Sequence, residues 1–258
     1  MELTPDKIPI IQTATFQRLR IAIENVAVTA GLGIVKGPVG IGKSFALSQL
    51  KDSFKEQGYD VILTSARTEA ARSINMFIND ILAMFDRRET QTNNAANSLR
   101  EIILRHGDRI EREKRILIVD ESQMLSSNIL ETLRGLYDQG DAARRGEPFK
   151  PAFGLLLVGN SQFLTKSGGA VNARYSPLMD RLSLFIELDG PSAAECLDFA
   201  RVISPDQPQI ADMLAECGRA RGNFRVIEKA AMQANFLGGG IITVASLEKA
   251  IFLMKGRK

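Results

Sequence analysis

The chain has 258 residues, of which 45% are hydrophobic, and its 33 basic and 30 acidic residues give a formal net charge of +3. Short, charge-interrupted apolar runs exclude a bilayer-spanning segment, and the first ten residues lack the basic and apolar regions of a secretory signal. The two cysteines have neither metal-ligand spacing nor the numbers for a disulfide framework. We therefore expect a cytoplasmic protein with a core large enough for either one large domain or a large domain joined to a smaller one.

Apolar periodicity predicts strands and helices that alternate along most of the chain. The predicted strands lie at 33–36, 60–65, 115–120, 153–160 and 182–188. The helices expected among them lie at 16–30, 44–57, 73–85, 95–113 and 127–136. Beyond these, only helices are predicted, near 192–203, 207–220, 222–236 and 244–254. This order predicts an α/β domain (1–190), in which helices cover both faces of a five-stranded parallel sheet, and a small C-terminal helical lid domain (191–258).

A glycine-rich stretch, "GPVGIGKS", lies between the first predicted strand and the following helix. It fits the pattern G-x-x-x-x-G-K-[ST], whose glycines let backbone N–H groups turn toward phosphate oxygens. Lys43 would reach the β- and γ-phosphates and the Ser44 hydroxyl would bind Mg²⁺. The alternative is a glycine turn with an incidental lysine. We predict an ATP site formed by Gly37, Pro38, Val39, Gly40, Ile41, Gly42, Lys43, Ser44 and Phe45.

Polar residues at the ends of later strands supply the groups that ATP hydrolysis needs. Asp120 ends the strand in "ILIVDES" and is predicted to hold Mg²⁺, while Glu121 is predicted to be the general base. The competing interpretation of Glu121 is an acidic N-cap. Asn160 ends the next strand, where its amide could orient water or sense the γ-phosphate. Arg181 and Arg225, each taken alone a typical surface residue, follow in an order that suggests charge stabilisation from a neighbouring subunit and from a lid.

This series of motifs resembles the AAA+ ATPases over nearly the whole chain. "GPVGIGKS" resembles Walker A, "ILIVDE" resembles Walker B, and Asn160 resembles the sensor-1 residue. Arg181 in "SPLMDRLS" is similar to an arginine finger, with Arg174 as the second candidate, and Arg225 in "GNFR" is similar to sensor 2. The resemblance implies an ATPase whose nucleotide lies between subunits of a homo-oligomeric ring or helical filament.

Within this superfamily, "ILIVDESQMLSSNILETLRGLYDQ" followed by "FGLLLVGNSQFL" resembles the phage Mu B protein and the TnsC-like and TniB-like transposition regulators. That resemblance implies a protein that polymerises on double-stranded DNA with ATP, selects the transposition target and activates the transposase. Only about 36 residues precede the Walker A stretch, too few for the N-terminal helix-turn-helix domain of the Mu protein. DNA contact is therefore expected from the ATPase domain itself.

Two arginine-containing segments are the predicted DNA-binding positions. They are "SARTEAAR" and "DRRETQTNN", and they supply Arg67, Arg72, Arg87 and Arg88. Contacts of this kind follow the phosphate backbone, so binding would tolerate any sequence and weaken with salt. Ordinary solvated arginines are the equal alternative at each position. The basic loop at 140–150 receives no assigned role.

Three other classes of protein share some or all of these motifs. A helicase loader related to IstB and DnaC shares every nucleotide motif and remains the alternative function, in DNA replication. A secretion ATPase of the ExeA type needs a membrane segment. A small-molecule P-loop kinase would lack the series formed by Asn160, Arg181 and Arg225.

Overall fold

The computed structural model describes residues 11–66, 73–85, 115–138, 153–165 and 175–255. The chain divides into two compact units. Arg18–Gly37 and Ser44–Leu188 form one, called here the α/β unit. The other, called the helical unit, comprises Met1–Gln17, Pro38–Lys43 and Asp189–Lys258. The assignment of residues 1–190 and 191–258 to separate domains stays a prediction.

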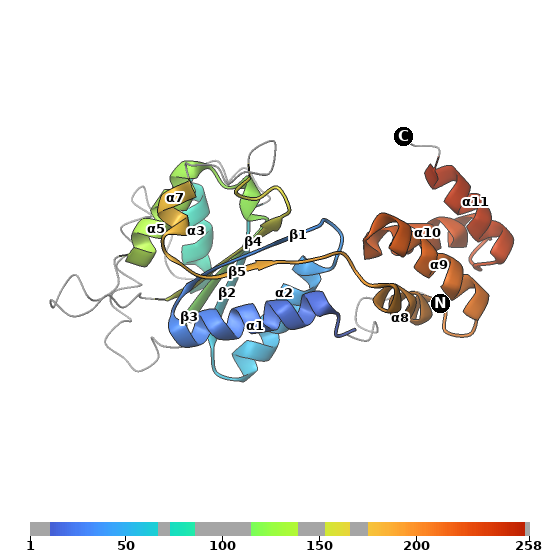
Figure 1. Ribbon diagram of the computed structural model, residues 1–258, viewed down its shortest axis with the longest axis horizontal. Coiled ribbons are helices and arrows are strands. Elements are labelled where there is room, and N and C mark those ends of the chain that lie inside the picture. Colours follow the sequence, from blue (N-terminus) through green and yellow to red (C-terminus); the bar gives the residue numbers. More distant parts are fainter. Residues whose placement is uncertain (1–10, 67–72, 86–114, 139–152, 166–174, 256–258) are drawn as a thin grey trace. The chain divides into compact units, whose positions relative to one another are not determined.

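One sheet of five parallel strands forms the centre of the α/β unit, in the order β2-β3-β4-β1-β5 (Figure 1). The strands are β1 (Leu32–Gly37), β2 (Asp60–Ser65), β3 (Arg115–Asp120), β4 (Gly154–Asn160) and β5 (Leu182–Glu187). The three inner strands are buried along almost their whole length, as uninterrupted apolar runs require. The predicted α/β fold is confirmed, and each predicted strand agrees with the structure to within one residue at either end.

Helices cover both faces of this sheet (Figure 1). One face carries α1 (Ala14–Thr29) and α2 (Lys43–Glu56), and the other carries α3 (Ile74–Phe85), α5 (Ser127–Asp138) and α7 (Ser176–Met179). Successive strand side chains point to opposite faces. In β3, Leu117 and Val119 therefore join the core cluster of α3 and α5, whereas the equally buried Ile116 and Ile118 point to the α1 and α2 face.

Small residues let α1 lie close to the sheet. A Cβ atom added at Gly154 would lie 2.5 Å from the backbone oxygen of Val26, and one added at Gly33 would lie 2.7 Å from Cγ2 of the same valine. Both distances are too short for any real side chain. The glycines at the start of β4 and in β1 thus set how closely the helix packs, and the dense core they permit stabilises the sheet.

The helical unit contains α8 (Ala193–Ile203), α9 (Pro208–Arg221), α10 (Phe224–Leu237) and α11 (Val244–Lys255). A capping box begins α8, in which Ser192 and Glu195 satisfy each other's backbone N–H groups. Gly222, with a φ of 64°, ends α9 in the left-handed conformation that glycine adopts without strain. Buried small and aliphatic side chains, including Cys196, Leu214, Ile227 and Leu247, form a core of their own. Burial, together with the nearby charge of Glu195, raises the pKa of the Cys196 thiol.

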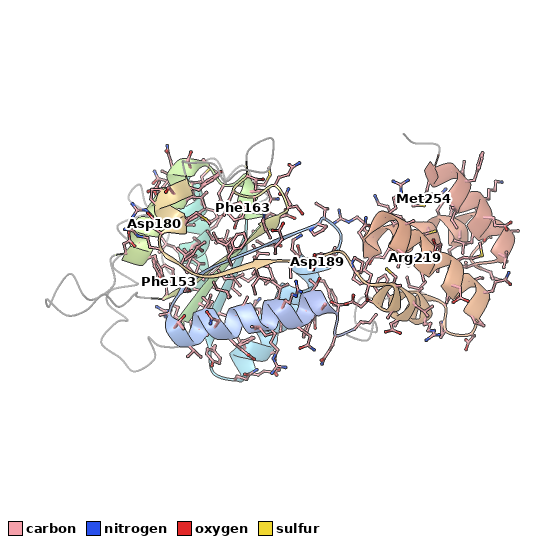
Figure 2. The ribbon with its side chains drawn as sticks, viewed as in Figure 1. Phe153, Phe163, Asp180, Asp189, Arg219 and Met254 are labelled. Atoms are coloured by element: carbon pink, nitrogen blue, oxygen red, sulfur yellow. The ribbon has the colours of Figure 1, made fainter. Side chains whose placement is uncertain are left out.

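Figure 2 labels side chains in each of the two units. Phe153 and Phe163 are buried in the α/β unit, and Met254 packs against the core of the helical unit. Within the described ranges, no helix is long and apolar enough to cross a bilayer.

Several elements differ from the prediction or fall beyond it. The helix expected at 95–113 lies outside the described residues. The sequence did not predict α7, which has four residues, or the 3-10 turn η5 (Ser122–Met124). Both are too short to show the 3.6-residue periodicity on which helix prediction depends.

Candidate functional site

Three of the polar residues predicted for catalysis or Mg²⁺ binding, Asp120, Glu121 and Asn160, lie at the carboxyl edge of the sheet. Asp120 ends β3 and Asn160 ends β4, and these two strands are neighbours. The register pairs Asn160 with Gly37, the last residue of β1 and the first of the glycine-rich stretch. Parallel strands carry their carboxyl ends on one edge, where α/β proteins bind ligands. The topology thus brings the ends of three separate segments together.

Asp120 is a buried carboxylate with two hydrogen bonds. Its Oδ2 accepts a hydrogen bond from the Ser44 hydroxyl at 2.6 Å, and its Oδ1 accepts one from the backbone N–H of Glu121 at 2.8 Å. Only 6% of the residue is exposed, so burial of the charge depends on these donors. The pair formed by Ser44 and Asp120 joins the first turn of α2 to the end of β3. Their role in binding Mg²⁺ stays a prediction.

Glu121 and Asn160 are linked by a residue that the sequence did not single out. The Gln123 side chain donates from Nε2 to Oε2 of Glu121 at 2.5 Å, and its Oε1 accepts from the backbone N–H of Asn160 at 3.0 Å. The Asn160 Oδ1 accepts from the backbone N–H of Gln162 at 2.9 Å. Its Nδ2 makes no hydrogen bond within the part of the chain that the structure describes. Because Gln123 is only two residues from Glu121 in "DESQ", the sequence could have suggested a contact between these two side chains. It gave no sign of the contact between Gln123 and Asn160.

Glu121 itself is the N-terminal flanking residue of η5, with φ 54° and ψ 35°. Its side chain makes no capping hydrogen bond to that turn, so the geometry does not match the N-cap interpretation. A non-glycine residue in this left-handed region is uncommon and is held there by its surroundings. The left-handed backbone at Glu121 therefore separates the end of β3 from the 3-10 turn that follows.

The central part of the glycine-rich stretch, Pro38–Lys43, belongs to the helical unit. Gly40 and Gly42 have φ values of 84° and 90°, which only glycine adopts without strain. A Cβ added at Gly42 would have no atom within 4 Å, so its backbone borders open space. Lys43 Nζ donates to the Pro38 carbonyl at 2.6 Å. Two other residues predicted to contact ATP, Val39 and Phe45, are exposed, while Ile41 is buried.

The start of α10 contacts this stretch within the helical unit. The backbone N–H of Phe224 donates to the Gly40 carbonyl at 2.9 Å. A Cβ added at Gly40 would lie 3.1 Å from Asn223 Cβ and 3.3 Å from Arg225 Cβ. Arg225, the predicted sensor-2 residue, is exposed and begins next to the loop. The sequence placed this arginine in the lid, but it gave no indication of the backbone hydrogen bond.

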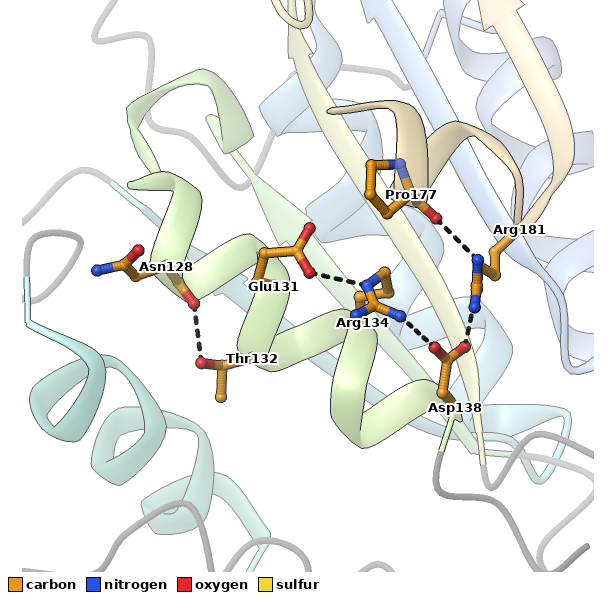
Figure 3. Close-up of polar contacts among 7 residues, drawn as sticks. All are labelled: Asn128, Glu131, Thr132, Arg134, Asp138, Pro177 and Arg181. Carbon is orange, nitrogen blue, oxygen red and sulfur yellow. Dashed lines mark hydrogen bonds and ion pairs between the residues drawn. The ribbon is translucent and has the colours of Figure 1, made fainter. Parts of the chain in front are cut away.

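Arg181 lies at the other end of the sheet and takes part in a network of charges (Figure 3). Its Nε contacts Asp138 Oδ1 at 3.2 Å, and its Nη1 donates to the Pro177 carbonyl at 3.4 Å. Arg134 also binds Asp138, and it reaches Glu131 at 2.9 Å. Hydrogen bonding to Glu131 raises the pKa of the Arg134 guanidinium; burial opposes this shift, and the charges of Glu131 and Asp138 add to it. The predicted finger is thus oriented by α5 of its own chain.

The remaining predicted positions lie outside the described residues. These are the four DNA-binding candidates, the second arginine-finger candidate and the basic loop, namely Arg67, Arg72, Arg87, Arg88, Arg174 and 140–150.

Comparison with known protein families decides the classification. A profile described as an AAA domain matches residues 26–166, more than half of the chain, from the end of α1 to just beyond β4. The chain belongs to the AAA domain family. A search of curated protein sequences returned no match to this AAA protein.

Solved structures share the fold of the AAA protein. The ORC2 protein of Aeropyrum pernix, in ADPNP and ADP complexes, has a TM-score of 0.65 at 15% identity, covering 96% of this chain and 69% of that one. Cdc6p from Pyrobaculum aerophilum has a TM-score of 0.65 at 17% identity, and the match covers 96% of this chain and 69% of Cdc6p. The Thermotoga maritima RuvB Holliday junction branch migration motor has a TM-score of 0.51 at 17% identity, and the match covers 93% of this chain and 68% of RuvB. At these identities the likeness concerns the fold.

Proposed function

We propose that this AAA protein binds ATP with Mg²⁺ and hydrolyses it. The observation that carries the proposal is the 2.6 Å contact between Ser44 and Asp120 at the carboxyl edge of the sheet. A hydroxyl and a carboxylate are oxygen ligands of the kind that Mg²⁺ prefers, and Mg²⁺ usually takes only one or two such groups besides phosphates and water. No cluster of three or more His, Cys, Asp or Glu side chains suited to a metal occurs among the described residues. The two side chains therefore fit a nucleotide-associated Mg²⁺ better than an all-protein metal cage.

Each surrounding residue has a role in this proposal. Lys43 and the backbone N–H groups of the glycine-rich stretch bind the phosphates, and a bound Mg²⁺ would neutralise phosphate charge. Glu121 takes the proton of the attacking water, and Asn160 orients that water. Arg225 acts from the helical unit. A Cβ at Gly40 would lie 3.3 Å from Arg225 Cβ, and this closeness to the glycine-rich stretch within the helical unit supports the role, because a guanidinium forms strong hydrogen bonds to phosphate oxygens.

The position of Arg181 supports assembly of several copies. It lies just before Leu182, which pairs with Leu32 at the amino end of β1, while the phosphate-binding stretch follows the carboxyl end. An arginine at the opposite end of the strand is suited to a neighbouring copy's nucleotide. We include in the proposal a homo-oligomer, ring or filament, in which Arg181 completes the adjacent site.

The finer proposal is that the assembly forms on duplex DNA, selects transposition targets and activates a transposase. Its support is the resemblance of the stretches around Asp120 and Asn160 to the Mu B and TnsC-like regulators. The fold likeness to a Holliday junction branch migration motor is compatible with DNA as the partner. Arg67, Arg72, Arg87 and Arg88 remain the proposed phosphate contacts.

Electron microscopy of the protein with duplex DNA and a non-hydrolysable ATP analogue tests this function. We expect DNA coated by a continuous protein filament or by stacked rings. Short footprints confined to single-stranded DNA would instead support the helicase-loader alternative.

Salt dependence of duplex binding tests the proposed contacts. Changing Arg87 and Arg88 together to alanine should weaken binding to all duplex sequences and flatten the slope of log affinity against log salt by about 0.9 for each lost contact. A double alanine variant of Arg219 and Arg221, two exposed arginines of α9, is the charge-matched control and should leave the slope unchanged. Equal slopes for the wild type and the Arg87 and Arg88 variant would contradict their role.

A further inference from the structure

Gln123 joins two parts of the proposed catalytic site that are distant in sequence. It lies in η5, the turn that follows β3, and its side chain bridges the carboxylate of Glu121 and the backbone N–H of Asn160. The two hydrogen bonds measure 2.5 Å and 3.0 Å, so both ends of one amide are used. The bridge spans from the end of β3 to the end of β4.

The chemistry of the two partners fixes the orientation of this amide. An ionised carboxylate only accepts hydrogen bonds, and a backbone N–H only donates them. The Gln123 NH₂ group must therefore face Glu121, and its oxygen must face Asn160. A flipped amide would place oxygen against oxygen and N–H against N–H, and both contacts would be repulsive. No other uncharged side chain of this length supplies a donor and an acceptor on one planar group.

The turn that carries Gln123 is itself held firmly. The fully buried Ser122 donates from its hydroxyl to the Val119 carbonyl at 2.8 Å. The backbone N–H of Met124 donates to the Glu121 carbonyl at 2.9 Å. These contacts hold Glu121 in its left-handed conformation and hold Gln123 facing β4. The direction of the Glu121 side chain thus depends on both the turn and the amide bridge.

We infer that Gln123 is a positioning residue for ATP hydrolysis, which keeps the carboxylate of Glu121 aligned with the strand end that carries Asn160. The inference rests on the proposed function, in which Glu121 activates the water. A general base must lie within hydrogen-bond reach of the proton it removes, and a misplacement of about 1 Å can reduce the rate 100-fold. Because Asn160 pairs with Gly37, the bridge also fixes Glu121 relative to the start of the phosphate-binding stretch.

Two substitutions separate the halves of the bridge. Gln123→Met keeps the length of the side chain and removes both hydrogen bonds. Gln123→Glu keeps an acceptor for Asn160 but loses the donor to Glu121 and sets two like charges side by side. We expect kcat to fall by about 10- to 100-fold in both variants, with the dissociation constant for ATP unchanged and the protein still folded at the assay temperature. Gln162→Met, an exposed glutamine close to Asn160, is the matched control and should keep wild-type kcat.

A double-mutant cycle distinguishes positioning from a general structural effect. If Gln123 acts through Glu121, then Gln123→Met should cost nothing further in a Glu121→Gln background, measured by long single-turnover incubations of the full chain with labelled ATP. The inference would be overturned if Gln123→Met reduced the hydrolysis rate by the same factor in both backgrounds. A wild-type or higher kcat in the Gln123→Met variant would also overturn it. If Gln123→Met unfolds at a lower temperature, the kcat of Gln123→Glu tests the inference instead, because the glutamate oxygen can still accept the hydrogen bond from the backbone N–H of Asn160.

The failure of the proposed function gives a different result. Turnover near the wild-type rate in Glu121→Gln alone would remove Glu121 from the role of base, whatever the Gln123 variants do. A slow Glu121→Gln combined with a fully active Gln123→Met would refute only the role of Gln123.

Discussion

Replacing Arg181 by alanine should remove a charge that only a neighbouring copy can present to the nucleotide. Arg181 precedes Leu182, which pairs with Leu32, whereas the phosphate-binding stretch begins at Gly37. Gly37 lies five residues after Leu32 along the strand, which corresponds to a rise of about 16 Å. An arginine side chain does not cover this distance. The variant should therefore bind ATP normally, and hydrolysis by the assembled protein should fall by about 1,000-fold or more.

Mixing this variant with Lys43→Ala should restore activity by a calculable amount. In a randomly mixed assembly of equal parts, one interface in four joins an intact pocket to an intact Arg181, so turnover should recover to about a quarter of the wild-type rate. The assay measures turnover against the ratio of the two variants at constant total protein, and the rate should peak at equal mixing. Arg20→Ala, which removes a surface ion pair with Glu24, is the control.

Absence of rescue, with mixed assembly verified by co-purification of differently tagged subunits, would refute this reasoning. The same mixing experiment on Arg174→Ala would then test the second candidate for the finger.

Three further predictions concern binding and stability. Lys43→Ala should lose ATP binding in calorimetry, because backbone amides alone do not offset the charge of the triphosphate; an unchanged affinity would contradict the assignment. Gly154→Ala should lower the free energy of unfolding in urea by about 1–3 kcal/mol, because its Cβ would collide with the backbone of α1. Gly135→Ala, in α5 with open space around its Cβ position, should instead raise it by about 0.5–1 kcal/mol, and equal effects would refute the packing argument. The last prediction concerns the pKa of the Glu195 carboxyl group. Burial acts to raise this pKa, but hydrogen bonds, first among them the one from the backbone N–H of Ser192, lower it below its ordinary 4.5. The ionised carboxylate of Glu195 therefore stabilises the folded protein above about pH 4.5, and this stabilisation is lost as the pH falls through the lowered pKa. The unfolding temperature of Glu195→Gln should accordingly fall less on acidification than that of the wild type.

The sequence alone predicted the five strands and the longer described helices, because their signals are local. Runs such as "RILIVD" are apolar without interruption, which suits only strands buried on both faces, and they matched the structure closely. The glycine pattern between a strand and a helix predicted a turn of the backbone there, and the structure shows positive φ at Gly40 and Gly42. Because such signals lie within a few residues, neither the order β2-β3-β4-β1-β5 nor the contacts among side chains followed from them.

Apart from Ser44 and Asp120, which were both predicted at the Mg²⁺ site, only the tertiary structure decided which distant polar groups make contact. Gln123 and Asn160 are 37 residues apart, and Arg181 and Asp138 are 43 apart, so no periodicity relates them. The same holds for the hydrogen bond between Phe224 and Gly40. These contacts exist because crossover connections bring distant strand and helix ends to shared edges, and a buried or half-buried polar group must find its partner there. A single sequence specifies that arrangement through the packing of the whole chain, and it contains no local sign of the pairs that result.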